Sequence, residues 1–251
     1  MNLIYPQPHQ PFDSFGLGHC IAMAVIFLGM ISIAIFRKKL QNSNGKIILR
    51  NIFIVILAIV QIYAFVWNYF WGNLLKEMLP LHLCGAIFIP ILIYPFAKGF
   101  LKQYCAELIF FWGMLGGSMA TIFPNPEGQN FPHTFVLQTF IFHGIILWFA
   151  IYLVCVEKLE LKVISVVRVI FSTIGLSVFA EIANHFIGSN YLFLNGNVEG
   201  VSTPLDLFGT GITRYIGLVV AFSIVQFIIF GIYKLFSSKQ KISPAYNVVN
   251  G

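Results

Sequence analysis

The stretch TFVLQTFIFHGIILWFAIYLVCV, residues 134–156, decides the fold class. It contains no Lys, Arg, Asp or Glu and reaches the ~20 mostly apolar residues that a helix needs to cross a bilayer. Further runs of this kind lie at about 16–36, 51–71, 80–97, 104–122, 165–187 and 214–236. The sequence therefore predicts an all-α, multi-pass protein of the cell membrane, a polytopic helical bundle with about seven transmembrane helices.

The composition of the chain supports a lipid environment for most of its length. Hydrophobic residues make up 58% of the 251 residues and charged residues only 10%, compared with about 25% charged residues in soluble domains. No connection is long enough to separate two domains, so we expect residues 1–251 to form a single integral membrane domain. The N-terminal segment before the first run has prolines and no Lys or Arg, which argues against a cleaved signal peptide.

The basic residues predict the orientation of the bundle. All but two of the 15 Lys and Arg fall on one side of the predicted membrane, and only Lys76 and Arg214 fall on the other. The positive-inside rule makes the basic side cytoplasmic. The N-terminus is then outside and the C-terminus cytoplasmic, which requires an odd number of spans. These short basic clusters indicate topology and not nucleic-acid binding, because they do not form one basic face.

Polar residues within the apolar runs are concentrated near one membrane surface. Because helix direction alternates, the outer half of the bilayer receives His19, Asn68, His82, Cys84, Ser118, Gln138, His143, Glu181, Asn184 and His185. Ionisable groups inside a membrane are costly and usually face the bundle interior. This layer predicts a polar cavity that opens outward. For His19 and His82, near helix ends, the sequence favours a hydrated interfacial position without a chemical role.

Cys84 is the candidate nucleophile. His82 and Cys84 are two residues apart in LPLHLC, so on a helix they would point to different faces and could not pair. A base for Cys84 must then come from another helix, and His143, at similar depth, is the best candidate. A neighbouring imidazole can make a thiolate nucleophile available. The other cysteines are expected to be packing residues: Cys20, Cys105 and Cys155.

Glu181, Asn184 and His185 share one face of the predicted helix 165–187. They could orient a catalytic histidine, or a Glu–His pair could ligate a metal. The chain has no CxxC, HxxxH or HExxH motif, so no metal and no cofactor are predicted. A metal hydrolase is a lower-ranked alternative, with the ligands His19, His143, Glu181 and His185.

Two further patterns bear on packing at the outer side and in the bundle. The outer connection 188–213 contains NYLFL, which is too apolar for a solvated loop and too short to span, so it should fold back as a lid or interfacial segment. Gly113, Gly117 and Ala120 follow the small-residue spacing that is typical of close helix packing.

The order of several motifs carries a family resemblance: LPLHLC, FFWGMLGG, FPNP with FPH, LQTFIFHG, GSNYLFL and PLDLFG. From about residue 15 to 236 the chain resembles the YwaF family of bacterial integral membrane proteins. More distantly, it resembles the animal transmembrane protein 164 family. Those proteins are described as membrane acyltransferases that move fatty acyl chains onto lysophospholipids through a cysteine and a histidine. The resemblance implies that the cysteine is Cys84 in LHLC and the histidine His143 in IFHG.

We therefore expect a lipid acyltransferase or acyl hydrolase near the outer leaflet. Its partners would be membrane lipids, with lysophospholipid and acyl-donor substrates. Cys84 would carry the acyl group and His143 would act as base and then acid. The supporting residues would be Glu181, Asn184, His185 and His82, with Glu181 or His185 orienting the imidazole or polarising the carbonyl, and the 188–213 connection gating entry. The alternative is a small-solute binding or transport protein without covalent chemistry, although no inverted repeat is evident.

Overall fold

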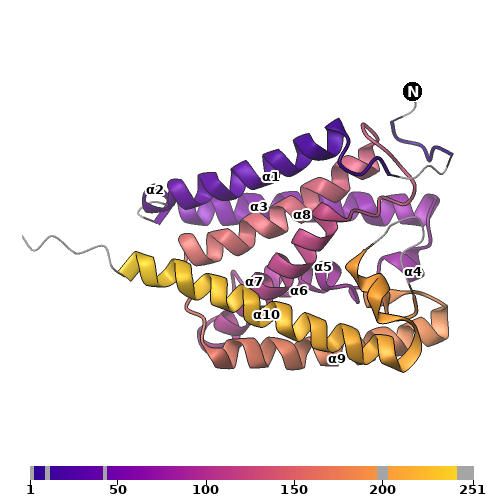
Figure 1. Ribbon diagram of the computed structural model, residues 1–251. Helices are drawn as coiled ribbons and strands as arrows, with labels where there is room; N and C mark the ends of the chain where they lie inside the picture. The colour runs from indigo at the N-terminus through magenta and orange to yellow at the C-terminus, as the bar shows by residue number, and fades with distance from the viewer. Residues whose placement is uncertain (1–2, 9–11, 42–43, 197–202, 242–251) are drawn as a thin grey trace, which may run out of the picture.

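The computed structural model describes residues 3–8, 12–41, 44–196 and 203–241, which form a helical bundle (Figure 1). Its long helices are α1 (Leu17–Ile35), α3 (Gly45–Phe70), α7 (Gly99–Ile122), α8 (Thr134–Cys155), α9 (Val163–Ile187) and α10 (Gly211–Lys241). These are the six helices in the described part of the chain that are long and apolar enough to cross a membrane. The all-α membrane architecture is therefore confirmed. The shorter elements are α2 (Arg37–Gln41), α4 (Leu74–Glu77), α5 (Leu83–Ala86), α6 (Phe88–Ile93) and the 3-10 helices η1 (Tyr191–Phe193) and η2 (Pro204–Phe208).

The predicted span at 80–97 is not one continuous helix, and this corrects the count of seven spanning helices. It consists of α5 and α6, which are separated at Ile87. Pro90 has no N–H with which to bond the Ala86 carbonyl, so the helix is interrupted there. From Leu83 to Ile93 it is only about 16 Å long at 1.5 Å per residue, whereas the hydrocarbon layer is ~30 Å thick. This broken segment still carries the chain from the end of the bundle where α3 ends to the end where α7 begins (Figure 1).

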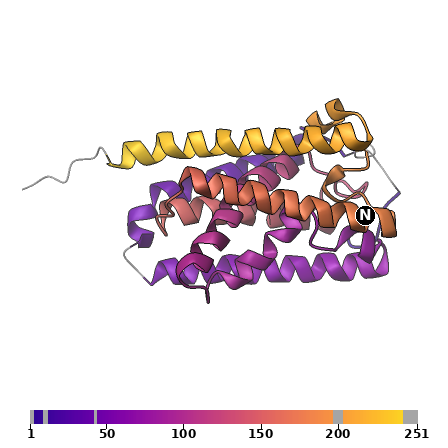
Figure 2. The ribbon, with the colours of Figure 1, turned by 90° about the horizontal axis from the view of Figure 1, so that it is seen from below.

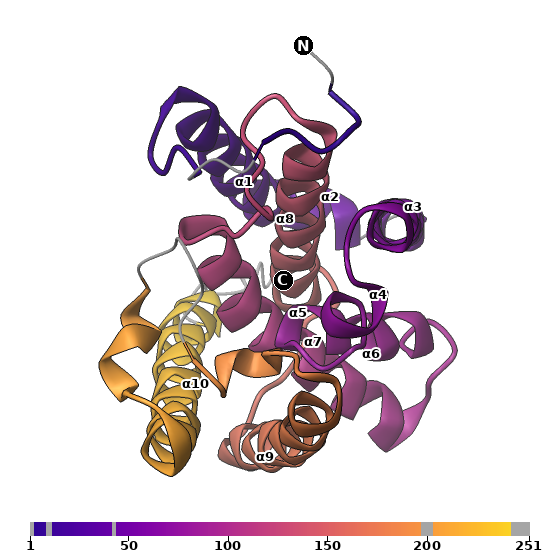
Figure 3. The same ribbon diagram turned by 90° about the vertical axis from the view of Figure 1, so that its right-hand side faces the viewer.

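Helices α7 and α8 lie at the centre of the bundle. Helix α8 packs against α1, α3 and α7, and α7 also contacts α5, α6, α9 and α10 (Figure 3). The apolar segment of each central helix is 67% buried, compared with 11–33% for the other four long helices. Helix α10, the least buried, runs along the periphery (Figure 2). The outer faces of these four helices are therefore the surfaces available to lipid.

Two glycines of α7 allow its close approach to α8. A Cβ atom placed at Gly113 would lie 3.1 Å from Cγ2 of Ile146, and one at Gly117 would lie 2.9 Å from Cγ of Leu147. Distances this short leave no room for a larger side chain without displacement of the neighbour. The predicted role of Gly113 and Gly117 in helix packing is confirmed.

An ion pair between a buried carboxylate and a half-buried arginine joins α7 to α9 at the opposite end of the bundle from the pocket described below. Glu107 is fully buried and accepts a hydrogen bond from Nε of Arg168 at 2.9 Å. Ser165 donates to the same carboxylate at 2.7 Å and Gln103 at 3.0 Å. A buried carboxylate is tolerated only with such partners, so this network fixes the two helices relative to each other.

The NYLFL segment folds back over the bundle, as its composition predicts. Its Tyr191 hydroxyl donates to the Leu75 carbonyl at 2.7 Å and accepts from Leu79 N at 3.0 Å. The buried Asn184 side chain accepts from Tyr191 N at 2.6 Å and donates to Tyr191 O at 3.0 Å. Residues 197–202 of the predicted lid lie outside the described residues. The described part ties the start of the connection to α9 and to the loop before α5.

Candidate functional site

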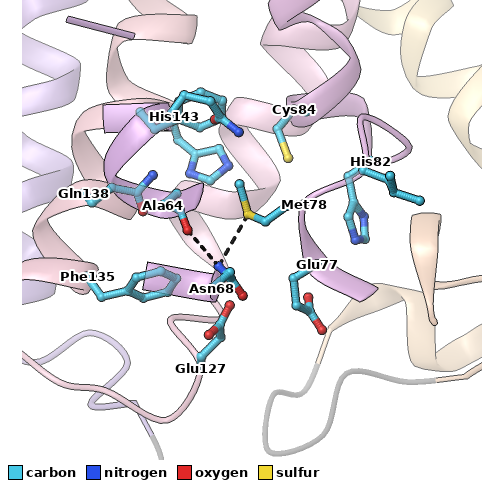
Figure 4. Close-up of a pocket in the computed structure, with 14 residues that line it drawn as sticks. Ala64, Asn68, Glu77, Met78, His82, Cys84, Glu127, Phe135, Gln138 and His143 are labelled. Carbon is cyan, nitrogen blue, oxygen red and sulfur yellow. Dashed lines mark hydrogen bonds between the residues drawn. The ribbon is translucent and has the colours of Figure 1, made fainter. Parts of the chain in front are cut away.

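A cavity of about 150 Å³ lies at the end of the bundle where α3 ends and α8 begins (Figure 4). Its walls come from α3, α4, α5, α8 and the loops before α5 and before α8. The lining residues are Gln61, Ala64, Asn68, Glu77, Met78, Leu79, His82, Cys84, Gly85, Glu127, Phe135, Gln138, Phe142 and His143. Five members of the predicted polar layer therefore meet in one pocket: Asn68, His82, Cys84, Gln138 and His143.

His143 presents a free basic nitrogen in this pocket. The side chain is 9% exposed, and its Nδ1 lies 2.7 Å from the Thr139 carbonyl one turn earlier on α8. A carbonyl oxygen can only accept, so Nδ1 carries the proton and Nε2 carries the lone pair. That Nε2 atom is buried without a hydrogen-bond partner. The ring is thus held as a neutral imidazole whose uncommitted lone pair can take a proton.

Cys84 is a half-buried free thiol at the start of α5. Figure 4 shows its sulfur directed into the cavity that the His143 ring also lines. Two adjacent glycines of α7 let the backbones of both residues approach that helix. A Cβ at Gly116 would lie 3.5 Å from Cys84 N, and one at Gly117 would lie 3.4 Å from His143 O. The thiol and Nε2 of His143 are not hydrogen-bonded to each other. Catalytic pairs often close to bonding distance only when substrate binds.

His82 occupies a position that helical spacing did not predict. It is the N-cap of α5, with extended backbone angles of φ −84° and ψ 152°. The premise that His82 and Cys84 point to different faces of one helix is therefore wrong, and both residues line the cavity. The His82 ring accepts a hydrogen bond at Nδ1 from Leu192 N at 3.3 Å. Its ring centroid is 5.1 Å from those of Tyr191 and Phe193.

The other predicted polar residues do not reach this pocket. Glu181 and His185 are exposed on the outer surface of α9, while Asn184 of the same helix is buried and holds the outer connection. His19 is buried between two backbone groups, accepting from Phe15 N at 2.9 Å and donating to Thr121 O at 2.8 Å. In the described part of the chain, His19, His143, Glu181 and His185 are not gathered into a metal-binding group. Glu181 and His185 thus have no contact through which to support Cys84 or His143.

Two acidic residues at the pocket, Glu77 and Glu127, were missed because they lie in the outer loops between the predicted spans. Burial raises the pKa of Glu127 to about 7, and the nearby Glu77 carboxylate adds to the rise. Hydrogen bonding with Trp67 and Asn68 opposes it. Burial also raises the pKa of Glu77. The sequence signal for this pair was weak, because each is a single carboxylate in an outer loop that also contains other polar residues.

Comparison with known protein families matches residues 14–234 to the TMEM164 family. The chain belongs to the TMEM164 family. The matched region runs from before α1 into α10 and includes Cys84 and His143. This finding confirms the resemblance to transmembrane protein 164, whereas the assignment to the YwaF family stays a prediction. No curated protein and no solved structure matches this TMEM164-family chain.

Proposed function

We propose that this TMEM164-family membrane protein is a lipid acyltransferase or acyl hydrolase in which Cys84 is the nucleophile and His143 the general base. The observation that carries the proposal is that a free thiol and an unpartnered imidazole nitrogen line one cavity. The Thr139 carbonyl, by accepting from Nδ1, directs the basicity of the ring to Nε2. The resemblance carried by LHLC and IFHG supports the same two residues.

The covalent chemistry proceeds in two acyl transfers. Nε2 of His143 takes the thiol proton while Sγ of Cys84 attacks the ester carbonyl carbon of the acyl donor. The oxyanion collapses, the ester C–O bond breaks, and the leaving alcohol takes the proton from the imidazolium. An acceptor hydroxyl then attacks the thioester, its proton passes to Nε2, and the C–S bond breaks to return the thiol. A lysophospholipid as acceptor gives transfer, and water gives hydrolysis.

The surroundings of the cavity favour a lipid substrate. The pocket lies toward one end of long apolar helices. If these helices span the bilayer, that end lies nearer to the lipid ester groups than the middle of the bundle does. Ala64, Leu79, Phe135 and Phe142 supply apolar walls, and the polar groups are few and convergent. An acyl ester can therefore enter from the bilayer with its carbonyl near Cys84.

Acylation of purified protein in detergent tests the proposal. With p-nitrophenyl octanoate as the probe, wild-type protein should release a burst of p-nitrophenolate and gain one octanoyl group, located on Cys84 by peptide mass spectrometry. Cys84→Ser should lose the thioester and at least ~10³-fold of the burst rate, because the activated thiolate is gone. His143→Asn should slow acylation by about 10²–10⁴-fold.

Cys155→Ser is the matched control, because Cys155 is another half-buried thiol and does not line the cavity. It should acylate at the wild-type rate. A probe adduct that persists in Cys84→Ser at the wild-type rate would remove Cys84 from the mechanism and leave the cavity as a binding site without covalent chemistry.

A further inference from the structure

His82 is the second histidine that lines the cavity of the proposed nucleophile. It precedes Cys84 by two residues and lines the same cavity. Figure 4 shows Cys84 between the rings of His143 and His82. Since His143 accepts the thiol proton from one side of the sulfur, a group that receives the carbonyl oxygen is needed elsewhere around the reacting carbon. His82 is suitably placed for that task.

The hydrogen bonding of His82 determines what its ring can offer. Leu192 N donates to Nδ1 at 3.3 Å, so Nδ1 carries a lone pair and, in the neutral ring, the proton is on Nε2. The ring is also fixed by edge-on contact with Tyr191 and tilted contact with Phe193, both at 5.1 Å. The Nε2–H group, in contrast, donates to no other described residue. It remains an N–H donor of a pre-oriented, neutral imidazole.

The backbone that holds the ring is itself constrained. Leu192 and Phe193 have positive φ angles of 55° and 57°, a conformation that costs free energy for residues other than glycine. Asn184 bonds both backbone groups of Tyr191, and Nε of Arg214 donates to Phe193 O at 2.6 Å. These contacts maintain η1 in the conformation that directs Leu192 N toward His82.

We infer that His82 is a catalytic residue of the same reaction: its Nε2–H donates a hydrogen bond to the acyl carbonyl oxygen and stabilises the oxyanion formed when Cys84 attacks. The inference rests on the proposed function. It assigns opposite tasks to the two histidines, because His143 receives a proton at Nε2 whereas His82 donates a hydrogen bond from Nε2. No proton is transferred from His82, so the acyl transfer steps keep the balance given above.

Two substitutions separate this role from a structural one. His82→Asn keeps an oxygen that can accept from Leu192 N but removes the donor that corresponds to Nε2–H. His82→Gln places an amide N–H near the Nε2 position but has no acceptor at the Nδ1 position for the hydrogen bond from Leu192 N. In stopped-flow acylation with p-nitrophenyl octanoate, His82→Asn should lower the acylation rate constant by about 10²–10³-fold with little change in KM. His82→Gln should remain within about tenfold of wild type.

A purely structural role predicts the opposite order, with His82→Asn near wild type and His82→Gln impaired, and that result would overturn the inference alone. If wild-type protein forms no adduct on Cys84, the proposed function and the role of His82 fail together. Histidine ¹⁵N NMR tests the tautomer directly on wild-type protein, and His82→Gln serves only to assign the His82 signal by its loss. The Nε2–H form is expected, and an Nδ1–H form would overturn the inference.

Discussion

Two histidines of one pocket are given different chemistry by their backbone partners. A carbonyl, that of Thr139, accepts from Nδ1 of His143, whereas an amide, that of Leu192, donates to Nδ1 of His82. Nε2 is therefore a base in His143 and a hydrogen-bond donor in His82. The residue type alone does not specify either role, and the local backbone determines which one each ring can perform.

Glu127 predicts a pH dependence of stability. Its pKa is about 7 in the folded protein, compared with an ordinary value of 4.5. Between these values the folded state retains a proton that the unfolded state has lost, so stability falls as pH rises from about 4.5 to 7 and stays low above it. Glu127→Gln should therefore be more stable than wild type at pH 8 but similar to it at pH 4.5.

Thermal unfolding in detergent measures this difference. A gain of ~1 kcal/mol at pH 8 would raise Tm by about 2–4 °C for a chain of this size. The control is Glu160→Gln, because Glu160 is exposed and does not line the cavity. If Tm of Glu127→Gln changes equally at both pH values, the carboxyl does not titrate as described.

The broken helix α5–α6 is the element that makes the site possible. Because helical structure starts only after His82, the side chains of His82 and Cys84 can both line the cavity. The segment is interrupted at Ile87, where Pro90 cannot donate to the Ala86 carbonyl, and it ends at Ile93, short of the length of a spanning helix. Irregular backbone at membrane depth is tolerated only where protein or a cavity covers it, and here the partners are α7 and η1.

Arg214 is the main anchor of the outer connection. Its fully buried guanidinium donates to the carbonyls of Phe193, Gly196, Leu205 and Gly209 at 2.6–3.1 Å. Arg214→Gln should lower the free energy of unfolding by more than about 3 kcal/mol, because several charged hydrogen bonds are lost and their carbonyls stay buried. Cleavage by chymotrypsin near η1 should become faster, and acylation should slow as His82 loses its support.

The matched control for this prediction is Arg50→Gln. The Arg50 side chain donates a hydrogen bond to the adjacent Asn51 near the start of α3, at the end of the helix away from the pocket. It should change stability by less than about 0.5 kcal/mol. Equal proteolysis rates in the two variants would show that Arg214 does not hold the outer connection.

At the scale of the whole molecule, the chain crosses between the two ends of the bundle six times in long helices and once in the broken segment (Figure 1). Together with the positive-inside rule, this arrangement predicts that the pocket opens away from the cytoplasm. Helices α10 and α7 begin at opposite ends of the bundle (Figure 1). The residues directly before them, Thr210 and Lys98, are both exposed. They provide positions for a topology test.

In a Cys20→Ser chain, Thr210→Cys should react with a membrane-impermeant maleimide on intact cells. Lys98→Cys should react only after the cells are permeabilised. Labelling of both positions in intact cells would contradict the three crossings, α7, α8 and α9, that separate them. The reverse labelling pattern would place the pocket on the cytoplasmic side.

The sequence by itself determined the class of this protein, an all-helical bundle whose apolar runs belong in lipid, and it predicts the direction of the crossings. Those features follow from the free-energy cost of placing charged and polar groups in lipid. That cost depends on the type of each residue and can be assessed position by position along the sequence. The pocket's members Cys84 and His143 were predicted by depth and resemblance. The tertiary structure decided which polar residues face one another: Asn184 points inward, while Glu181 and His185 on the same helix face out. Lipid and protein core are both apolar, so hydropathy does not fix the rotation of a helix about its axis, and only packing does.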